Sequence, residues 1–161
     1  MVERNRDKRT SSSRWRYAGL LLVAGMMSAP PLLASSRDTI KDRAVGYRAI
    51  GAAFKKANDE LRSGSPDIAV VRSSASAISK TVAGQHLWFP AGSGPAVGVK
   101  TRAKRDIWTN PADFKAAQNA MAARANAFLK ASRGRDADAM RQAAKELGAT
   151  CTGCHRRFRE E

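Results

Sequence analysis

Four segments of this sequence carry apolar residues at steps of three and four, which places those side chains on one face of an α-helix. The segments cover residues 40–61, 68–82, 114–128 and 140–158. None of them alternates apolar and polar residues with the period of two that is typical of β-strands. Four amphipathic helices must bury their apolar faces against one another, so the sequence predicts an all-α fold, an antiparallel four-helix bundle.

Glycine and proline mark the ends of these segments. Residues 63–66 (SGSP) end the first segment, Gly84 ends the second and Gly134 ends the third. Pro66 and Pro111 stand near the starts of the second and third helices. We expect both prolines to lie in a first helical turn, where the missing N–H has no partner to lose.

Residues 85–109 form a long connection between the second and third helices. A connection of this length is uncommon inside a compact domain unless it has a function. It contains Trp88, Phe89 and Trp108, three large apolar rings that are unfavourable in water. We therefore expect something besides the helix faces to receive these rings.

The N-terminal segment differs in composition from the rest of the chain. Residues 1–16 carry six basic side chains against two acidic ones, and residues 17–36 carry no charge. A basic start, a short apolar stretch and small residues near a cleavage point are typical of a secretory signal peptide. A retained membrane anchor is the alternative, but Pro30 and Pro31 interrupt the apolar run. We expect residues 1–34 to be cleaved, leaving a soluble domain of residues 35–161 in the bacterial periplasm.

The most specific motif is Cys-x-x-Cys-His, formed by Cys151, Cys154 and His155. This motif is the attachment signature of c-type haem. Two cysteines three residues apart project from the same side of a helix, so their sulfurs can form thioethers with the two vinyl groups of haem. His155 lies one turn beyond Cys151 on that side and can ligate the iron. The motif predicts one haem c, bound covalently through Cys151 and Cys154.

Three other uses of these residues are weaker. A thioredoxin-like dithiol stands at the start of a helix beside a β-sheet, whereas this motif closes an all-helical chain. A zinc site needs about four ligands, and the distant His86 would have to join Cys151, Cys154 and His155. A structural disulfide would suit an exported protein but would leave the adjacent histidine as a coincidence.

An exported four-helix chain with this motif near its end resembles the cytochrome c' family, the class II c-type cytochromes, which is itself a standard example of the bundle architecture. The resemblance covers nearly all of residues 37–161. Besides the haem motif it includes residues 42–47 (DRAVGY), residues 98–102 (GVKTR) and Ile107-Trp108.

The resemblance implies roles for single residues around the haem. His155 would be the proximal iron ligand, and Arg43 would contact a haem propionate. Tyr47 would line the side of the haem opposite His155, at the position where low-spin relatives carry a methionine ligand. Because no methionine lies in the first helix, Tyr47 predicts a vacant sixth position and therefore five-coordinate, high-spin iron.

Three further residues have weaker assignments. Arg159 matches a basic residue that the family holds beside the proximal histidine, and Phe158 would pack against the haem edge. Arg159 also has a plainer explanation, as a solvated group near the end of the chain. His86, in the long connection, is a candidate sixth ligand, although a lone histidine there is more often a surface residue.

The chain has a formal net charge of +15 at pH 7, which would attract polyanions. We expect no nucleic-acid partner, because export argues against one and no recognition-helix pattern appears. An acidic redox partner or the face of an anionic membrane suits the charge better. Basic residues that form a positive surface in the connection and the C-terminal segment are Lys100, Arg102, Lys104, Arg105, Arg156 and Arg157.

The resemblance also implies a homodimer through the first two helices, where small residues permit one: Ala49, Ala53, Ala69 and Ala77.

Two function classes remain open at this stage. In the first, the protein binds small diatomic gases such as nitric oxide or carbon monoxide, and the resemblance implies nitric oxide binding or detoxification, with electron transfer as an additional role. In the second, it is a low-spin, six-coordinate periplasmic electron carrier. Neither is enzymatic catalysis, and the sequence offers no constellation of acid, base and nucleophile that would suggest an enzyme.

Overall fold

The structure, a computed structural model, describes residues 31–95 and 100–161. Its four long helices are α1 (Pro31–Arg62), α2 (Ile68–Ala83), α4 (Pro111–Ala131) and α5 (Ala137–Phe158). Two short turns, η1 (Gln85–Leu87) and α3 (Asp106–Thr109), lie between α2 and α4. The predicted signal peptide lies outside the described residues, except that the backbone of residues 31–34 belongs to α1.

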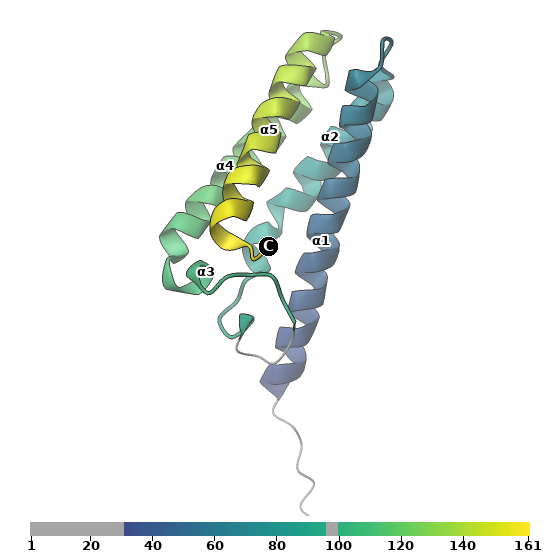
Figure 1. Cartoon of the computed structure of the whole chain (residues 1–161). Helices are drawn as coiled ribbons and strands as arrows, with labels where there is room; N and C mark the ends of the chain where they lie inside the picture. Colours follow the sequence, from purple (N-terminus) through teal and green to yellow (C-terminus); the bar gives the residue numbers. More distant parts are fainter. Residues whose placement is uncertain (1–30, 96–99) are drawn as a thin grey trace, which may run out of the picture.

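The four long helices form an antiparallel bundle (Figure 1), which confirms the predicted fold class. Helix α1 packs against α2 and α5, and α4 packs against the same two helices. The short connections α1–α2 and α4–α5 lie at one end of the bundle, and the C-terminus lies toward the other end. Within the described ranges, no helix is long and apolar enough to cross a membrane.

Two aspartates begin α2 and α5 in the same way. Asp67 and Asp136 have extended backbone angles (φ −73°, ψ 101° and φ −80°, ψ 103°), and each carboxylate accepts two N–H groups of the first helical turn. These N–H groups have no partner within the helix, so the caps stabilise both helix starts. Pro111 occupies the first turn of α4, as expected. The expectation for Pro66 is wrong, because the Asp67 cap places the start of α2 after the proline.

The apolar faces of the four helices meet in one main core, the aliphatic core. A smaller group, the aromatic cluster, consists of Ile107, Phe114 and Phe158. The aliphatic core lies along the bundle, and the aromatic cluster joins α3, α4 and α5 at the end of the bundle that holds the C-terminus. The fully buried side chains of the aliphatic core include Val71, Ile78, Phe128, Met140 and Leu147.

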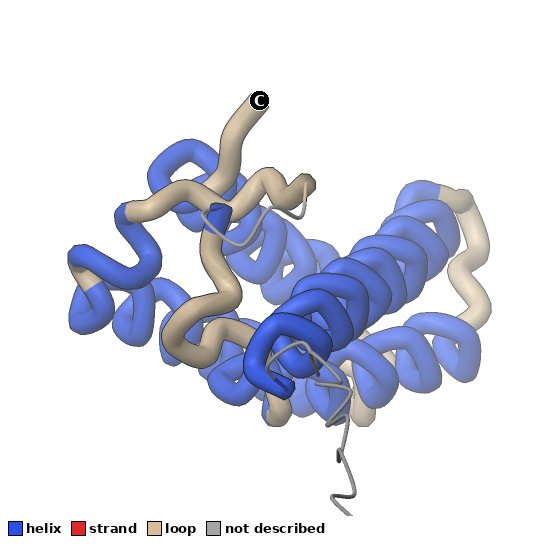
Figure 2. Tube along the Cα trace, turned by 90° about the horizontal axis from the view of Figure 1, so that it is seen from below, coloured by secondary structure: helices blue, strands red, loops and turns tan. Residues whose placement is uncertain are grey.

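The long connection between α2 and α4 crosses the end of the bundle beside the C-terminus (Figure 2). Its later part is tied to the end of α5 by an isolated antiparallel bridge between Ala103 and Arg159. The Lys104 N–H donates to the Phe158 carbonyl at 2.9 Å, and the Glu160 N–H donates to the Arg102 carbonyl at 2.7 Å. Residues 102–104 of the connection are therefore tied to the helix that carries the haem motif.

Candidate haem site

The haem motif lies in the last two turns of α5. The thiols of Cys151 and Cys154 are free and half-buried, and burial raises the pKa of each. Cys151 packs against the aliphatic core, whereas Cys154 packs against the aromatic cluster. The two sulfurs therefore face the interior at the point where the two groups of apolar side chains meet.

His155 is exposed, and Arg159, which ends α5, lies against it. One guanidinium nitrogen of Arg159 is 3.5 Å from Nδ1 and 3.4 Å from Nε2 of the imidazole. That guanidinium nitrogen therefore contacts both ring nitrogens about equally. Partial burial, then Arg159 and Arg102, lowers the pKa of His155, which favours the neutral form that binds metals.

Arg43 extends from α1 into the same end of the bundle and is 4% exposed. Its guanidinium donates to the hydroxyls of Ser93 (3.2 Å) and Thr101 (2.8 Å). It also lies over the Phe89 ring, with 4.8 Å between Cζ and the ring centroid. No carboxylate forms an ion pair with it within the described part of the chain. Burial lowers the pKa of Arg43, and a buried cation of this kind calls for an anion.

Tyr47 lies one helical turn after Arg43 and faces the two thiols. Burial is the main reason that the pKa of the Tyr47 hydroxyl is raised, and the nearby Cys154 thiol is the next. The hydroxyl therefore stays protonated at neutral pH. The hydroxyl donates to Oε1 of Gln85 at 3.5 Å. The ring packs edge-on against Trp88, with 5.0 Å between ring centroids.

The rings of the long connection, whose destination the sequence left open, pack at this end of the bundle. Trp88 lies directly on Gly46, where an added Cβ would come within 2.3 Å of the indole. Phe89 contacts both Trp108 (6.1 Å) and Phe114 (4.7 Å) by ring centroids. Together with Tyr47 these rings form an aromatic wall around Arg43.

Phe158 and His86, the two remaining residues singled out in the sequence, lie in different surroundings. Phe158 is 3% exposed and packs edge-on against Phe114, with ring centroids 5.1 Å apart, beside Cys154. His86 is exposed and its Nδ1 lies 3.1 Å from the Ala83 carbonyl. It borders a cavity of about 560 Å³ whose lining includes neither cysteine nor His155. The structure therefore brings Phe158 to the site but gives His86 no place beside the thiols.

These residues fit a haem group better than the alternatives. Two half-buried thiols, an imidazole whose lowered pKa favours the neutral form and an aromatic wall suit a large apolar ring. Among the residues described, the buried guanidinium hydrogen-bonds to two neutral hydroxyls, so it suits a carboxylate at the edge of such a ring, as a haem propionate provides. No group of three or more metal-binding side chains gathers among the residues described, so a zinc site has no support.

Sequence reasoning missed several partners at this site. Ser93 and Thr101, which hold Arg43, are small polar residues in a connection where many residues are polar, so no spacing marked them. Gln85 and Gln118, which approach Tyr47, carry no motif either. The haem motif, Arg43 on an apolar stripe and the loop aromatics were signals in the sequence, but none of them identified these partners.

Comparisons with known proteins agree with this geometry. Residues 38–159 match the sequence model of the cytochrome c' family. The chain is 40% identical over 72 residues to cytochrome c' of Pararhodospirillum photometricum, a match that spans 45% of this chain and only 56% of that relative. It is 28% identical over 144 residues to cytochrome c' of Allochromatium vinosum, spanning 88% of this chain and 93% of the relative.

The fold comparison gives the same result. The solved cytochrome c' of Shewanella frigidimarina superposes with a TM-score of 0.73 at 28% identity, over 78% of this chain and 97% of its own. The family match covers most of the chain, including the haem motif, Arg43 and Tyr47. This chain therefore belongs to the cytochrome c' family, and that membership implies a haem c cofactor.

Proposed function

We propose that this chain binds one haem covalently through Cys151 and Cys154, with His155 as the axial ligand, and that it binds nitric oxide and carbon monoxide. The observation that carries the proposal is Tyr47, which faces the thiols from α1 with a neutral hydroxyl. A protonated phenol is a poor ligand, so the side of the haem opposite His155 has no strong protein ligand at this position. Haem held by these residues would supply iron with a position free for a diatomic gas, which corresponds to the predicted five-coordinate, high-spin state.

The protein side chains would orient the group and restrict what reaches it. Arg159 contacts both nitrogens of the His155 ring and would limit its rotation. Arg43 would pair with a propionate, which satisfies the buried guanidinium. Tyr47 and the aromatic wall would hinder water and larger polar ligands, because Tyr47, Trp88 and Phe89 present bulky rings packed against one another.

Relatives support gas binding. Solved structures of cytochrome c' from Alcaligenes xylosoxidans, 23% identical to this chain with a TM-score of 0.71, include variants bound to carbon monoxide and to nitric oxide. We propose the same ligands for this chain, with binding or detoxification of nitric oxide as the role. We propose binding and not catalysis, because the site presents a guanidinium, a neutral phenol and two amides in place of an acid–base pair.

Electron transfer is the second candidate, because basic side chains surround the end of α5. Arg156 and Arg157 are exposed there, and Lys104 donates to the Arg156 carbonyl at 3.4 Å. A positive surface beside a haem would attract an acidic redox partner.

We also propose that the chain is exported to the periplasm and loses residues 1–34.

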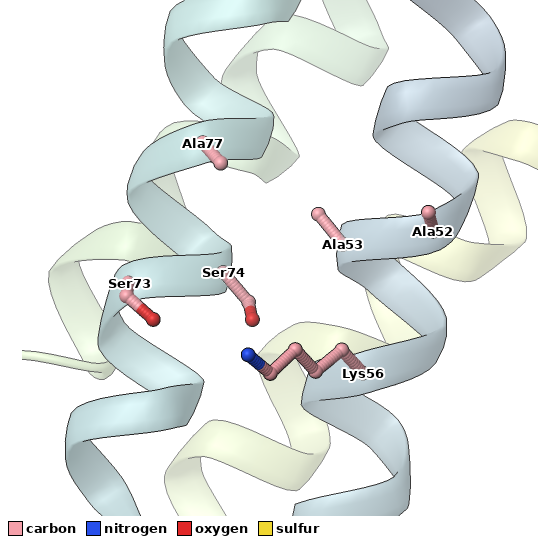
Figure 3. Close-up of a pocket in the computed structure, with 6 residues that line it drawn as sticks. All are labelled: Ala52, Ala53, Lys56, Ser73, Ser74 and Ala77. Carbon is pink, nitrogen blue, oxygen red and sulfur yellow. The ribbon is translucent and has the colours of Figure 1, made fainter.

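A groove between α1 and α2 supports the proposal of a homodimer through these helices (Figure 3). Ala53 and Ala77, two of the four small residues noted in the sequence, line it, and the Lys56 side chain extends across it toward Ser74. A relative that is 24% identical to this chain, with a TM-score of 0.72, has a ligand-controlled dimer dissociation. Sedimentation of Ala53→Arg against the unchanged protein, with and without carbon monoxide, tests this point.

Optical spectra of the purified, haem-loaded protein test the proposed function. We expect a high-spin ferrous spectrum that shifts on addition of carbon monoxide and of nitric oxide. Tyr47→Met places a ligand at the same position, so we expect that variant to become low-spin and to bind carbon monoxide more weakly. A low-spin spectrum of the unchanged protein that carbon monoxide does not alter would replace gas binding with the electron-carrier function.

A further inference from the structure

Two buried glutamines join the end of α2 to α4 by a reciprocal pair of hydrogen bonds. Nε2 of Gln85 donates to the Gln118 carbonyl at 3.0 Å, and Nε2 of Gln118 donates to the Gln85 carbonyl at 3.1 Å. Gln85 is 3% exposed and Gln118 is 9% exposed. Buried amides hold their partners firmly, because water is not available to replace a broken bond.

The same pair reaches the Tyr47 hydroxyl. Oε1 of Gln85, whose amide nitrogen is already used, accepts from this hydroxyl at 3.5 Å. Gln118 reaches this arrangement from α4 through its bond to the Gln85 carbonyl. The Tyr47 hydroxyl is thus held by a group from another element, η1.

Gln85 also begins the turn that delivers two of the rings around Tyr47. Trp88 and Phe89 follow it by three and four residues, and the Trp88 N–H donates to the Gln85 carbonyl at 3.1 Å. Trp88 packs edge-on to Tyr47, and the Phe89 ring centroid is 6.2 Å from that of Tyr47. A single residue therefore fixes the phenol by its side chain and the neighbouring rings by its backbone.

We propose that Gln85 is a positioning residue that holds Tyr47 across the ligand side of the haem site and thereby slows the entry of diatomic gases. The part concerning gas entry rests on the proposed function, whereas the part concerning Tyr47 does not. A gas molecule can reach the far side of a bulky ring only if that ring turns away. A hydrogen bond at the tip of the ring opposes this turn.

Gln85→Met tests the proposal, because methionine has nearly the same length and shape but can neither donate nor accept strongly. Tyr47→Phe removes the other end of the same bond. Each variant is made in the haem-loaded protein without residues 1–34, which include Tyr17, so that Tyr47 is the only tyrosine present in the Gln85 series. Asn126→Ala is the matched control, because Ser79 donates to Asn126 at 2.7 Å and also links α2 to α4.

Two readouts are needed. Ultraviolet resonance Raman scattering from Tyr47 reports the hydrogen bond of its hydroxyl, whether or not the protein binds gas. Flash photolysis of the carbon monoxide complex reports the rate of gas entry. We expect Gln85→Met to shift the Tyr47 bands and to raise the association rate about two- to tenfold, the effect of one hydrogen bond. Tyr47→Phe should raise the rate similarly, the double variant should add little, and Asn126→Ala should change neither readout.

Several results would overturn the inference. If the Raman bands of Tyr47 are the same in the Gln85→Met variant and in the protein that retains Gln85, Gln85 does not hold the phenol. If the bands shift but the association rate stays constant, the bond does not control entry. If the effects of Gln85→Met and Tyr47→Phe are additive, they act separately. Should Gln85→Met not fold, an unchanged rate in Tyr47→Phe alone rejects the proposal. Failure of the unchanged protein to bind gas rejects the proposed function, and the Raman result still decides the positioning of Tyr47.

Discussion

The two ends of the bundle are built differently. At the end that holds the connections α1–α2 and α4–α5, aspartate caps satisfy the helix starts and the interior is apolar, as with Phe128, Met140 and Leu61. At the other end the interior contains a buried arginine, two buried glutamines and two half-buried thiols. The buried groups of the first end are apolar or, as with Ser132, hydrogen-bonded within their own helix, whereas the second end contains groups whose burial is favourable only with a partner. This contrast places stability at one end and ligand chemistry at the other.

The largest expected effect is loss of the cofactor at the thiol end. In the double variant Cys151→Ala, Cys154→Ala we expect no covalently bound haem, because neither thioether can form. Haem staining after denaturing electrophoresis measures this. Asp136→Ala, at the opposite end, should keep its haem. Haem that survives denaturation in the double variant would show that attachment does not use these cysteines.

The next largest expected effect is a loss of stability from a substitution at the end of the bundle that holds the connections α1–α2 and α4–α5. Phe128 is fully buried in the aliphatic core, so Phe128→Ala should lower the free energy of unfolding by about 3–5 kcal/mol through lost burial and a residual cavity. Denaturant unfolding of the haem-loaded protein measures the loss. We expect the affinity for carbon monoxide to stay within about twofold, since less than 0.5 kcal/mol would reach the site. A large change in affinity would break the proposed division between the two ends.

Two glycines of α1 sharpen the comparison within one helix. A Cβ on Gly46 would come within 2.3 Å of the Trp88 ring, whereas nothing lies within 4 Å of a Cβ on Gly51. We expect Gly46→Ala to lower the free energy of unfolding by about 1–3 kcal/mol through overpacking. Gly51→Ala should raise it by about 0.4–1 kcal/mol, because alanine loses less backbone entropy in a helix. Equal effects of the two substitutions would mean that Trp88 moves aside freely.

The smallest expected effect depends on pH. Burial raises the pKa of Tyr47 above its ordinary value, so the native state holds this proton more tightly than the unfolded state. The stability contribution is complete below the unfolded pKa of about 10 and is lost as the pH rises above it. The free energy of unfolding of the unchanged protein should therefore fall relative to that of Tyr47→Phe above about pH 10. Parallel curves for the two proteins would indicate an unburied phenol.

Much of the fold was predictable because it depends on local spacing. The four apolar stripes appear as four long helices, and Pro111 begins α4 as its position suggested. The start of α2 was misplaced because a proline just before a cap and a proline in a first turn look alike in sequence. The side chain of Asp67, which accepts from two N–H groups, decides between them.

The site was predictable in part, through residues with distinctive chemistry. Cys151, Cys154 and His155 carry a motif, and Arg43 on an apolar stripe was difficult to explain without an anion. The hydroxyls that hold Arg43 and the amides that hold Tyr47 were not predictable. Serine, threonine and glutamine occur throughout the chain, and only the packing of the connection against α1 and α4 distinguishes these few.

The sequence by itself determined the helices, the haem motif and the family, because each follows from side chains close together along the chain. The tertiary structure alone decided which groups surround Tyr47 and Arg43. Gln85 and Gln118 are 33 residues apart, and Arg43 and Thr101 are 58 apart. Such pairs meet only when the bundle closes, since no local preference of either residue selects the other. The composition of the site thus follows from burial, which leaves each polar group only the partners that the fold provides.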